Sequence, residues 1–391
     1  MKNKSTLIIF TLLLLTQYFF PDLCLSENIL QKLRENQMDM QNQLQKAQKK
    51  DLEQYSTARQ KQAVNFHNAF EKQGKEFLLL KNRVEKLWPR IILNSKNNWV
   101  KYNPKANTKS EVDFENGTIT LEVVVEDSKV DKATSLEIAE ITKSSMKSQL
   151  AGLMATGVLD RQIADNNNAA ISNKQAVNFL NRDLANNLTV NRKIVIGKDG
   201  VKRRIVQYKF NMIQDHVLIR AENYLTTVSK YAREKKLDPA LILAIIHTES
   251  HFNPLAVSHC HAYGLMQIIP RFAGLEANRI LGRNFIPDKK ALLDPATNIQ
   301  MGCVYFSRLV YRYFSNYEYP ANLYFSIAGY NWGTRMVKQR IIKQYLPDTR
   351  DGDHVYLTLK KHSPNETKLY LEKVLLRKKV IWDKIVKEYS L

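Results

Sequence analysis

The sequence is short of acidic residues. Its 391 residues include 38 Asp and Glu against 59 Lys and Arg, which gives a formal charge of +21 at pH 7. Such a charge favours polyanionic partners, among them nucleic acid, anionic lipid and an acidic cell-wall polymer. No nucleic-acid-binding motif accompanies the charge, and we therefore expect no nucleic-acid partner.

The sequence also has no apolar run at its start that is long enough for a membrane helix. The first run extends from Leu7 to Leu15, and less purely to Phe20, whereas a membrane span needs ~20 apolar residues. Lysines precede this run and polar sequence follows it, which is the pattern of a secretory signal peptide. We expect a signal peptide over residues 1–26, with cleavage after Ser26, and export of the rest of the chain.

Cysteine is scarce, with three in the whole chain. Cys24 is a candidate for lipid attachment, which would tie the protein to a membrane, although Asp22 and Leu23 before it fit a lipoprotein signal poorly. Only Cys260 and Cys303 are certain to remain after export. In an oxidising compartment they can pair or stay as two separate buried thiols, and their spacing does not decide between these.

Residues 27–89 predict a helical spacer. The stretch is polar, rich in glutamine and free of proline until Pro89. Its apolar residues fall on a seven-residue spacing, which favours an amphipathic helix or a weak coiled coil: Leu30, Leu33, Met40, Leu44 and Ala47.

Residues 90–212 predict a small α+β domain with an antiparallel sheet. Apolar and polar residues alternate over 112–125 around Asn116-Gly117, which is a strong hairpin signal. Helical spacing follows over 135–154, and 165–168 is typical of a loop. Strand character returns over 193–196 and 204–210, on either side of a turn at 198–200.

Residues 213–391 are predicted to be mainly helical, so the whole chain is expected to be α+β. One amphipathic helix is expected from Val217 to Ala232. Proline marks the start of three further predicted helices, at Asp238-Pro239, Asp294-Pro295 and Pro320-Ala321. Proline also marks a helix end, because Asn253-Pro254 is predicted to end the helix over 241–250. The last stretch, 368–391, predicts a basic amphipathic helix.

Glu249 is the main candidate for chemistry. It stands at the end of an apolar helix that contains Ile245 and Ile246. Burial disfavours the charged form, so the pKa of this carboxyl is expected to be raised, and the negative end of the helix acts in the same direction. A carboxyl that stays protonated near neutral pH can donate its proton to a glycosidic oxygen. The alternative is a glutamate that caps a helix or forms a salt bridge.

The sequence around Glu249 resembles the lytic transglycosylases of the soluble-transglycosylase type, within the lysozyme-like superfamily. Four blocks carry the resemblance: 249–258 with 262–270, 294–302, 328–333 and 364–374. The hairpin over 112–125 is similar to the N-terminal domain of the membrane-bound lytic murein transglycosylase C subfamily. Trp332 departs from the family pattern, because small residues are common at that position, and Cys24 lacks the lipid-attachment context typical of the subfamily.

The resemblance implies a lysozyme-like catalytic domain over 213–391 that acts on peptidoglycan in a bacterial envelope, in the periplasm and possibly at the outer membrane. Glu249 would act as acid and then as base, leaving a 1,6-anhydro-muramic acid end without consuming water. A hydrolase usually needs a second carboxylate, and none stands in an obviously catalytic position, since Asp238 and Asp294 are explained as helix caps. Substrate-binding roles carry over to Ser258, Gly264, Leu265, Met266, Gln267, Tyr330, Asn331 and Tyr370.

Each of these supporting residues also has a structural interpretation. Met266 can be part of the core, Ser258 a turn residue and Asn331 the end of a helix, while Gly264 is expected at a close backbone approach or a positive φ. The carried-over roles for the other residues are contacts with the sugar. The domain over 90–212 would position the enzyme on the wall or on partner proteins that the sequence does not identify.

Two other functions stay open at this stage: a hydrolytic muramidase on the same fold, and a wall-binding factor without activity. His247 and His251 are spaced as zinc ligands on a helix would be, but Glu249 does not follow the first histidine directly as the zinc protease pattern requires. We therefore expect neither a metal nor a cofactor. The basic surface offers a second means of membrane association beside Cys24.

Overall fold

The computed structural model describes residues 74–390 apart from 166–168, 173–174, 177, 179–187, 191–193 and 346–349, together with a few positions between 35 and 53. The predicted signal peptide, Cys24 and most of the predicted spacer lie outside the described residues. The chain divides into two units, Met1–Glu76 and Phe77–Leu391. Within the described ranges, no helix is both long and apolar enough to cross a membrane.

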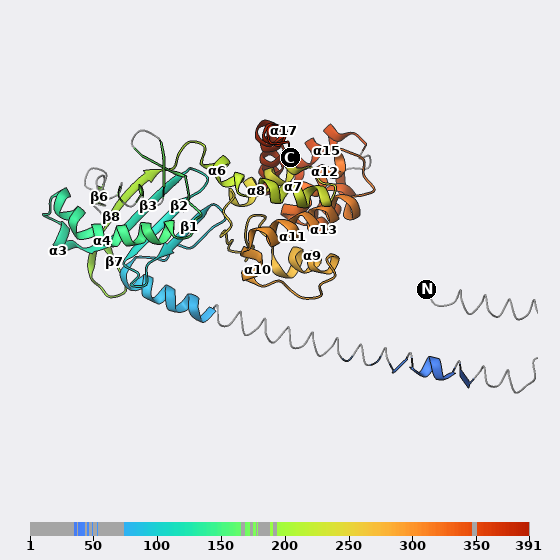
Figure 1. The fold of residues 1–391 in the computed structure, drawn as a ribbon, viewed down its shortest axis with the longest axis horizontal. Helices are drawn as coiled ribbons and strands as arrows, with labels where there is room; N and C mark the ends of the chain where they lie inside the picture. The colour runs from blue at the N-terminus through green and yellow to red at the C-terminus, as the bar shows by residue number, and fades with distance from the viewer. Residues whose placement is uncertain are drawn as a thin grey trace, which may run out of the picture. The chain divides into compact units, whose positions relative to one another are not determined.

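An antiparallel sheet forms the first part of the second unit (Figure 1). Its strand order is β1-β2-β3-β8-β6, and β7 also pairs with β8. The strands are β1 Asn98–Tyr102, β2 Thr108–Asp113, β3 Thr118–Glu126, β6 Leu188–Val190, β7 Val195–Ile196 and β8 Lys202–Asn211. A second, two-stranded sheet is made of β4 Ile163–Ala164 and β5 Ala170–Ile171.

The predicted hairpin is confirmed. β2 and β3 pair in an antiparallel register that places Asp113 opposite Thr118, and Gly117 in the turn has φ +64°, a conformation that glycine adopts at little cost. The predicted helix over 135–154 is α4 (Ser135–Met154). It packs on β2 and β3, and the short helix α3 (Asp127–Val130) follows β3 directly.

A helix over 74–87 joins the sheet. Val84 and Trp88 at its end are buried with Ala106 and Val124 of the sheet region, and the Trp88 indole N–H donates to Ala106 O at 2.6 Å. A Cβ at Gly197 would lie 2.1 Å from Lys86 O, so the close approach of β7 to this helix requires glycine.

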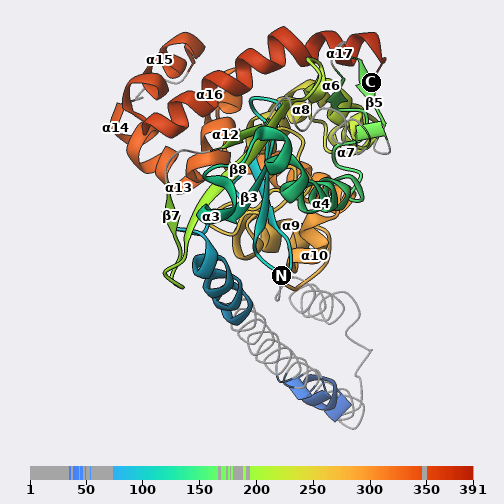
Figure 2. The same cartoon turned by 90° about the vertical axis from the view of Figure 1, so that its left-hand side faces the viewer.

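The second part of the unit is helical (Figure 2). Its α-helices are α6 His216–Glu222, α7 Leu225–Glu234, α8 Pro239–Ser250, α9 Leu275–Ile280, α10 Lys289–Leu293, α11 Pro295–Arg308, α12 Ala321–Trp332, α13 Thr334–Met336, α14 Lys343–Tyr345, α15 Gly352–His362, α16 Asn365–Arg377 and α17 Asp383–Glu388. Single π-helical turns lie between some of them: η1 Pro270–Gly274, η2 Leu309–Tyr313, η3 Val337–Ile342 and η4 Lys378–Trp382. The α+β class is confirmed.

The single helix predicted from Val217 to Ala232 is wrong. The chain forms α6 and α7 instead, with Asn223 and Tyr224 between them. The break lets α7 pack against α8 and α11, while α6 places His216 and Arg220 in the interior beside the sheet domain. Spacing alone did not indicate the break, because apolar residues continue at helical intervals across it.

Helix α8 is the centre of the helical core. Its start is confirmed: Asp238 accepts a hydrogen bond from Ala240 N at 2.8 Å, and Pro239 is the first helical residue. Its predicted last residue, Ser250, is confirmed as well, but the helix ends at the left-handed residues that follow it and not at Asn253-Pro254. His251 and the following Phe252 are left-handed, with φ of +49° and +60°.

The cap predicted for the helix after Asp294 is confirmed as well. Asp294 accepts from Thr297 N at 2.9 Å at the start of α11. At the far end of the chain, the predicted basic helix is made of α16, η4 and α17 in succession.

Candidate active site

Glu249 lies in the last turn of α8 and is partly exposed, while the helix before it is buried from Ala240 to Thr248. Burial raises the pKa of Glu249 to about 7. The negative charge of Glu366 acts in the same direction, whereas the Tyr370 hydroxyl and the charge of Lys96 oppose it. The raised pKa that the sequence predicts is therefore confirmed, with burial as the main cause.

Two phenols lie beside this carboxyl. Tyr370 of α16 is buried, and its hydroxyl approaches Glu249 without meeting ordinary hydrogen-bond geometry with any described residue. Tyr330 of α12 donates to Met266 O at 2.7 Å. Burial, together with the charge of Glu249, holds the pKa of both phenols well above the ordinary value. Both therefore remain protonated at neutral pH.

The loop over 264–267 is fixed to α8 and α11. Ser250 Oγ donates to Leu265 O at 2.8 Å, and Met266 N donates to Asn298 Oδ1 at 2.8 Å. The side chains of Leu265 and Met266 are fully buried. Met266 lies so close to Gly302 of α11 that a Cβ there would be 2.1 Å from its sulfur. The Met266 side chain thus belongs to the core, and its carbonyl is the part that meets Tyr330.

Gly264 and Gln267 both have left-handed backbones. The positive φ predicted for Gly264 is confirmed at +73°, and a Cβ there would lie 2.4 Å from Leu292 O. Gln267 has φ +48°, and its side-chain amide donates to Gly264 O at 2.9 Å and to Ala256 O at 3.3 Å. These bonds fix the direction of its remaining side-chain oxygen.

That oxygen, Gln267 Oε1, is buried without a hydrogen-bond partner in the described structure, as is the Tyr370 hydroxyl. Leaving a buried polar atom unpaired costs about 1–3 kcal/mol. Such atoms are usually satisfied by protein or water, and exceptions need an explanation. Here both atoms belong to residues for which the family resemblance implies sugar binding. A sugar hydroxyl or amide can form hydrogen bonds with them.

Asn331 and Ser258 have structural contacts. Asn331 Oδ1 accepts from Thr367 Oγ1 at 2.8 Å, which joins α12 to α16 next to Tyr370. Ser258 Oγ accepts from Ala262 N at 3.0 Å, and Ser258 N donates to Ala262 O at 3.0 Å. Ser258 thereby closes the turn over 258–262, and no hydrogen bond from it to Glu249 is present. This geometry agrees with its interpretation as a turn residue.

The two histidines beside Glu249 pack against each other rather than around a common centre. Their ring centroids are 5.3 Å apart at an angle of 84°, and His251 lies just outside the helix. Burial, together with the charge of Arg377, lowers the pKa of His247 to about 2 and that of His251 to about 3. Across the described ranges, no three His, Cys, Asp or Glu side chains gather as metal ligands would.

The two cysteines do not pair in this structure. Cys260 is exposed on the turn that Ser258 closes, and Cys303 is buried in α11. Burial raises the pKa of the Cys303 thiol far above its usual range.

Four residues near Glu249 were not among the site residues predicted from the sequence. Lys96 and Glu366 are the charged residues whose fields act on Glu249, and Arg220 and Arg377 bind the backbone around it. Glu366 lies within the block 364–374, which is part of the family resemblance, so the sequence does contain a signal for it. The other three have no local signal, because each meets the site from a distant part of the sequence.

Family models match two consecutive parts of the chain. Residues 63–223 match the N-terminal domain of membrane-bound lytic murein transglycosylase C, and residues 226–351 match the transglycosylase SLT domain. The two matches meet between residues 223 and 226, whereas the boundary predicted from the sequence lies at 212/213.

Solved structures with local similarity include two lytic transglycosylases. Slt from Pseudomonas aeruginosa is 31% identical, with a TM-score of 0.34, over 41% of this chain and 24% of that one. The 70 kDa soluble enzyme from Escherichia coli is 28% identical, with a TM-score of 0.34, over 40% and 23%. The chain thus spans about a quarter of these longer proteins.

Two relatives that match over most of their length have the same name. Membrane-bound lytic murein transglycosylase C from Mannheimia succiniciproducens is 32% identical over 291 residues, which are 70% of this chain and 78% of the relative. The protein of that name from Actinobacillus succinogenes is 31% identical over 311 residues, 74% of this chain and 84% of the relative. The chain therefore belongs to the membrane-bound lytic murein transglycosylase C family of lytic transglycosylases.

Proposed function

We propose that Glu249 carries both proton transfers in the cleavage of peptidoglycan between N-acetylmuramic acid and N-acetylglucosamine. In the first step, the protonated carboxyl donates its proton to the glycosidic oxygen, the bond from that oxygen to C1 breaks, and the glucosamine leaves with a free hydroxyl. In the second, the muramic acid 6-hydroxyl attacks C1 and gives its proton to the Glu249 carboxylate. The ring closes as a 1,6-anhydro sugar, Glu249 is protonated again, and no water is consumed.

The pKa of about 7 for Glu249 carries this proposal. A carboxyl with a pKa near the working pH is protonated in a substantial fraction of the molecules before the first step, and the carboxylate that this step leaves is basic enough to accept the proton in the second. The buried oxygen of Gln267 and the hydroxyl of Tyr370, both unpaired in the described structure, are proposed to receive hydrogen bonds from the sugar or to donate to it. Tyr330 and the Met266 carbonyl, which it binds, would border the same subsite.

Asn331 and the backbone of Gly264 and Leu265 complete the proposed site. Asn331 uses its oxygen to hold Thr367, so its amide group is the part proposed to meet the acetamido group of the sugar. Gly264 and Leu265 would shape the loop rather than contact the substrate through side chains, since Leu265 is fully buried.

The products distinguish the proposal from its competitors. We expect sacculi digested by the chain without residues 1–26 to release muropeptides that are lighter by one water than fragments with reducing ends, as mass spectrometry reads directly. Fragments with reducing ends would make the protein a hydrolase on the same fold. An absence of fragments would favour a wall-binding factor.

Glu366 gives the hydrolase a specific candidate. Its charge acts on Glu249, and a hydrolase would need a second carboxylate opposite the acid. Glu366 is exposed in the first turn of α16, where water screens its charge, and we therefore favour the transglycosylase.

We expect the pH dependence of kcat/KM to show one break, with activity falling as pH rises through about 7. The first step needs protonated Glu249, and its pKa is about 7. The nearby histidines add no break between pH 5 and 8, because the pKa values of His216, His247 and His251 are lowered to about 4, 2 and 3. Initial rates on soluble glycan chains from pH 4 to 9 measure this. A rate that rises through pH 7 would contradict Glu249 as the acid.

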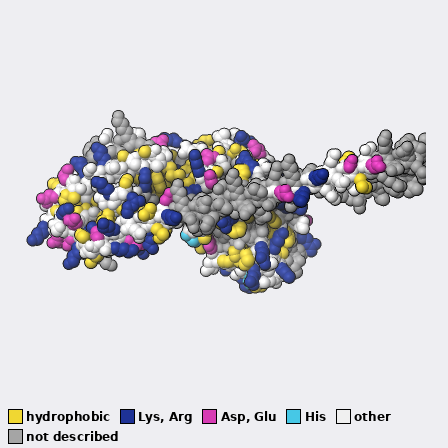
Figure 3. Space-filling model, turned by 90° about the horizontal axis from the view of Figure 1, so that it is seen from below, with side chains coloured by type: hydrophobic (Ala, Val, Ile, Leu, Met, Phe, Trp, Pro, Cys, Tyr) yellow, Lys and Arg dark blue, Asp and Glu magenta, His cyan; other side chains and the backbone are white. Residues whose placement is uncertain are grey.

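The envelope location is proposed from the relatives and the charge. The relatives are named membrane-bound, and Lys and Arg side chains are scattered over the surface in Figure 3. We propose that the protein acts in the periplasm at the outer membrane, held by Cys24 or by this basic surface, with the domain over 90–212 positioning it on the wall. Fractionation of cells that express the Cys24→Ala variant tests the anchor, since release into the soluble fraction is expected only if the lipid holds it.

A further inference from the structure

Arg220 of α6 joins three segments that are distant in sequence. It is 1% exposed. Its Nε donates to His251 O at 2.9 Å, and its Nη2 donates to Phe114 O at 3.2 Å. Its Nη1 donates to Gln162 Oε1. One guanidinium thus holds the β2–β3 turn and the segment before β4 against the residue that ends α8.

Ion pairing does not account for this arginine. In the described structure no acidic side chain contacts it, and burial lowers its pKa to about 9. Besides the three acceptors above, the guanidinium contacts the Met212 sulfur at 3.7 Å, the His216 ring nitrogen at 3.1 Å and the Phe114 ring, whose centroid is 4.8 Å away. A buried cation without an opposite charge is costly. What arginine offers here is a planar group whose donors bind several carbonyls at fixed angles.

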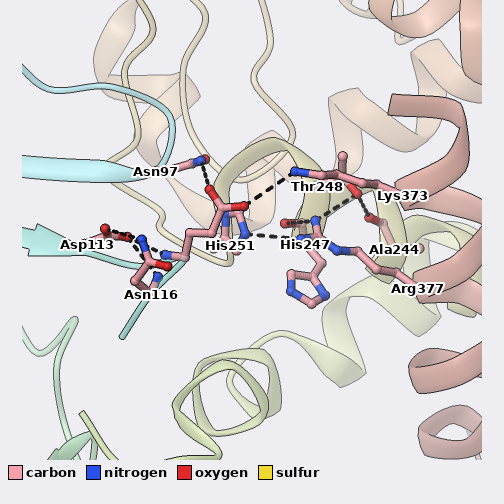
Figure 4. A network of polar contacts seen from close by, with 10 residues as sticks. Asn97, Asp113, Asn116, Ala244, His247, Thr248, His251, Lys373 and Arg377 are labelled. Carbon is pink, nitrogen blue, oxygen red and sulfur yellow. Dashed lines mark hydrogen bonds and ion pairs between the residues drawn. The ribbon is translucent and has the colours of Figure 1, made fainter. Parts of the chain in front are cut away.

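A second arginine, Arg377, also binds the end of α8. Arg377 Nη1 of α16 donates to His247 O at 2.9 Å and to Thr248 Oγ1 at 3.1 Å. Figure 4 shows these contacts beside His251, whose ring nitrogen is 3.3 Å from Arg377 Nη2. The carbonyls two residues before and two residues after Glu249 are therefore each fixed by a guanidinium.

The β2–β3 turn has its own contact with α16. Lys373 Nζ lies 3.5 Å from the Glu115 carboxylate, which also accepts from Asn97 Nδ2 at 2.6 Å. Together with Arg220, this contact docks the turn of the sheet domain onto the part of the helical domain that carries the candidate acid.

The backbone that Arg220 binds is strained. His251 and Phe252 have φ of +49° and +60°, a conformation that residues other than glycine adopt only at an energetic cost. Such a conformation persists where the surroundings fix it, as the hydrogen bond to His251 O does. Without that bond, we expect the turn to relax and the last turn of α8 to move with it.

We infer that Arg220 is a positioning residue, through which the sheet domain fixes the backbone that places Glu249. The inference rests on the proposed function of Glu249 and adds to it that the sheet domain takes part in building the active site. Removing the guanidinium should then change catalysis more than substrate binding.

Arg220→Met tests this, because methionine fills part of the space without the donors. We expect kcat to fall about 10- to 100-fold, since a displacement near 1 Å at a catalytic group costs about that much. KM is expected to stay within about threefold, because the residues proposed to contact sugar are untouched. The break in the pH profile is expected to move down from pH 7, as a displaced Glu249 is more exposed to water.

Two variants serve as controls. Arg203 is 8% exposed and binds Asp199 within its own strand region, so Arg203→Met should lower the melting temperature while leaving kcat and the pH break unchanged. Arg220→Lys keeps the charge but not the planar group, and is expected to behave like Arg220→Met. If Arg220→Met does not fold, Gln162→Leu takes its place, because it removes one acceptor of the guanidinium. The same fall in kcat and the same shift of the pH break are then expected, but both smaller.

Unchanged kcat and an unchanged pH break in folded Arg220→Met would overturn the inference, and so would full activity in Arg220→Lys. The proposed function fails separately, if Glu249→Gln retains turnover.

Discussion

Glutamine in place of Glu249 is expected to lower kcat for the digestion of sacculi by about 10³- to 10⁴-fold. The amide keeps the size of the side chain but neither donates a proton to the glycosidic oxygen nor accepts one from the 6-hydroxyl. Both steps of the proposed mechanism are lost at once. Single-turnover release of muropeptides measures the effect, and binding to sacculi, followed by sedimentation, is expected to stay within about twofold because the sugar contacts remain.

Glu366→Gln is the matched control, since Glu366 is the other carboxylate whose charge acts on Glu249. Activity within about threefold of the unmodified protein is expected, because the group is exposed and its field is screened. If the two variants lost activity equally, the reaction would need two carboxylates, and the hydrolase would replace the transglycosylase.

The same substitution at Glu249 has a second consequence, in stability. The pKa of Glu249 is raised from 4.5 to about 7, so the folded protein holds a proton that the unfolded chain releases. The stabilisation that the folded protein gains from the protonated Glu249 carboxyl is therefore fully present below pH 4.5, and it is lost as the pH rises through about 7. Relative to the unmodified protein, Glu249→Gln should therefore gain about 1–3 kcal/mol between pH 4 and pH 8, less than the full shift implies because the side chain is partly exposed. Urea unfolding at both pH values measures it, and an equal difference at both would contradict a raised pKa.

Gly264→Ala is expected to destabilise the protein by about 3–5 kcal/mol. The backbone has φ +73°, and a Cβ would lie 2.4 Å from Leu292 O and 2.5 Å from Asn298 Nδ2. Neither neighbour can move freely: Leu292 O is backbone, and the Asn298 amide is fully buried and binds Met266 N, Tyr263 O and Leu292 O. The cost therefore combines backbone strain with displacement of the bonds that hold the 264–267 loop.

Gly282→Ala separates the cost of backbone strain from the cost of crowding around the added Cβ. Gly282 has nearly the same backbone, with φ +77°, but nothing lies within 4 Å of an added Cβ. A loss of about 1–2 kcal/mol is expected from the left-handed conformation alone. Urea midpoints of the two variants measure the difference, and equal losses would show that the crowding around Gly264 relaxes without cost.

The sequence predicts those features whose cause is local. The caps at Asp238 and Asp294 need only a side chain and the two or three amides that follow it. The hairpin needs Asn116-Gly117 between alternating residues. The raised pKa of Glu249 follows from an apolar helix around a single carboxyl. In each case the physical cause lies within about one or two turns of the residue concerned.

The rest depends on contacts between distant segments. Arg220 meets Phe114 across 106 residues, and Arg377 meets His247 across 130, so neither leaves a pattern in the sequence. The left-handed His251, which ends α8 before the predicted proline, is stabilised by Arg220, and it was missed for the same reason. The depth of Met266 in the core depends on Gly302 of α11, which no property of the 264–267 segment reveals.

The turn closed by Ser258 provides a position for a fluorescent label. Cys260 on this turn is exposed, while Cys303 is buried, so in a chain without residues 1–26 a thiol-specific fluorophore attaches to the folded protein at one place. Bridge pairs of Val257 with Tyr263 and of Tyr263 with Ile268 join that turn to the segment that contains Gln267. We therefore expect the emission of a dye at Cys260 to change when glycan binds at the proposed site, and the slow labelling of Cys303 to report on unfolding.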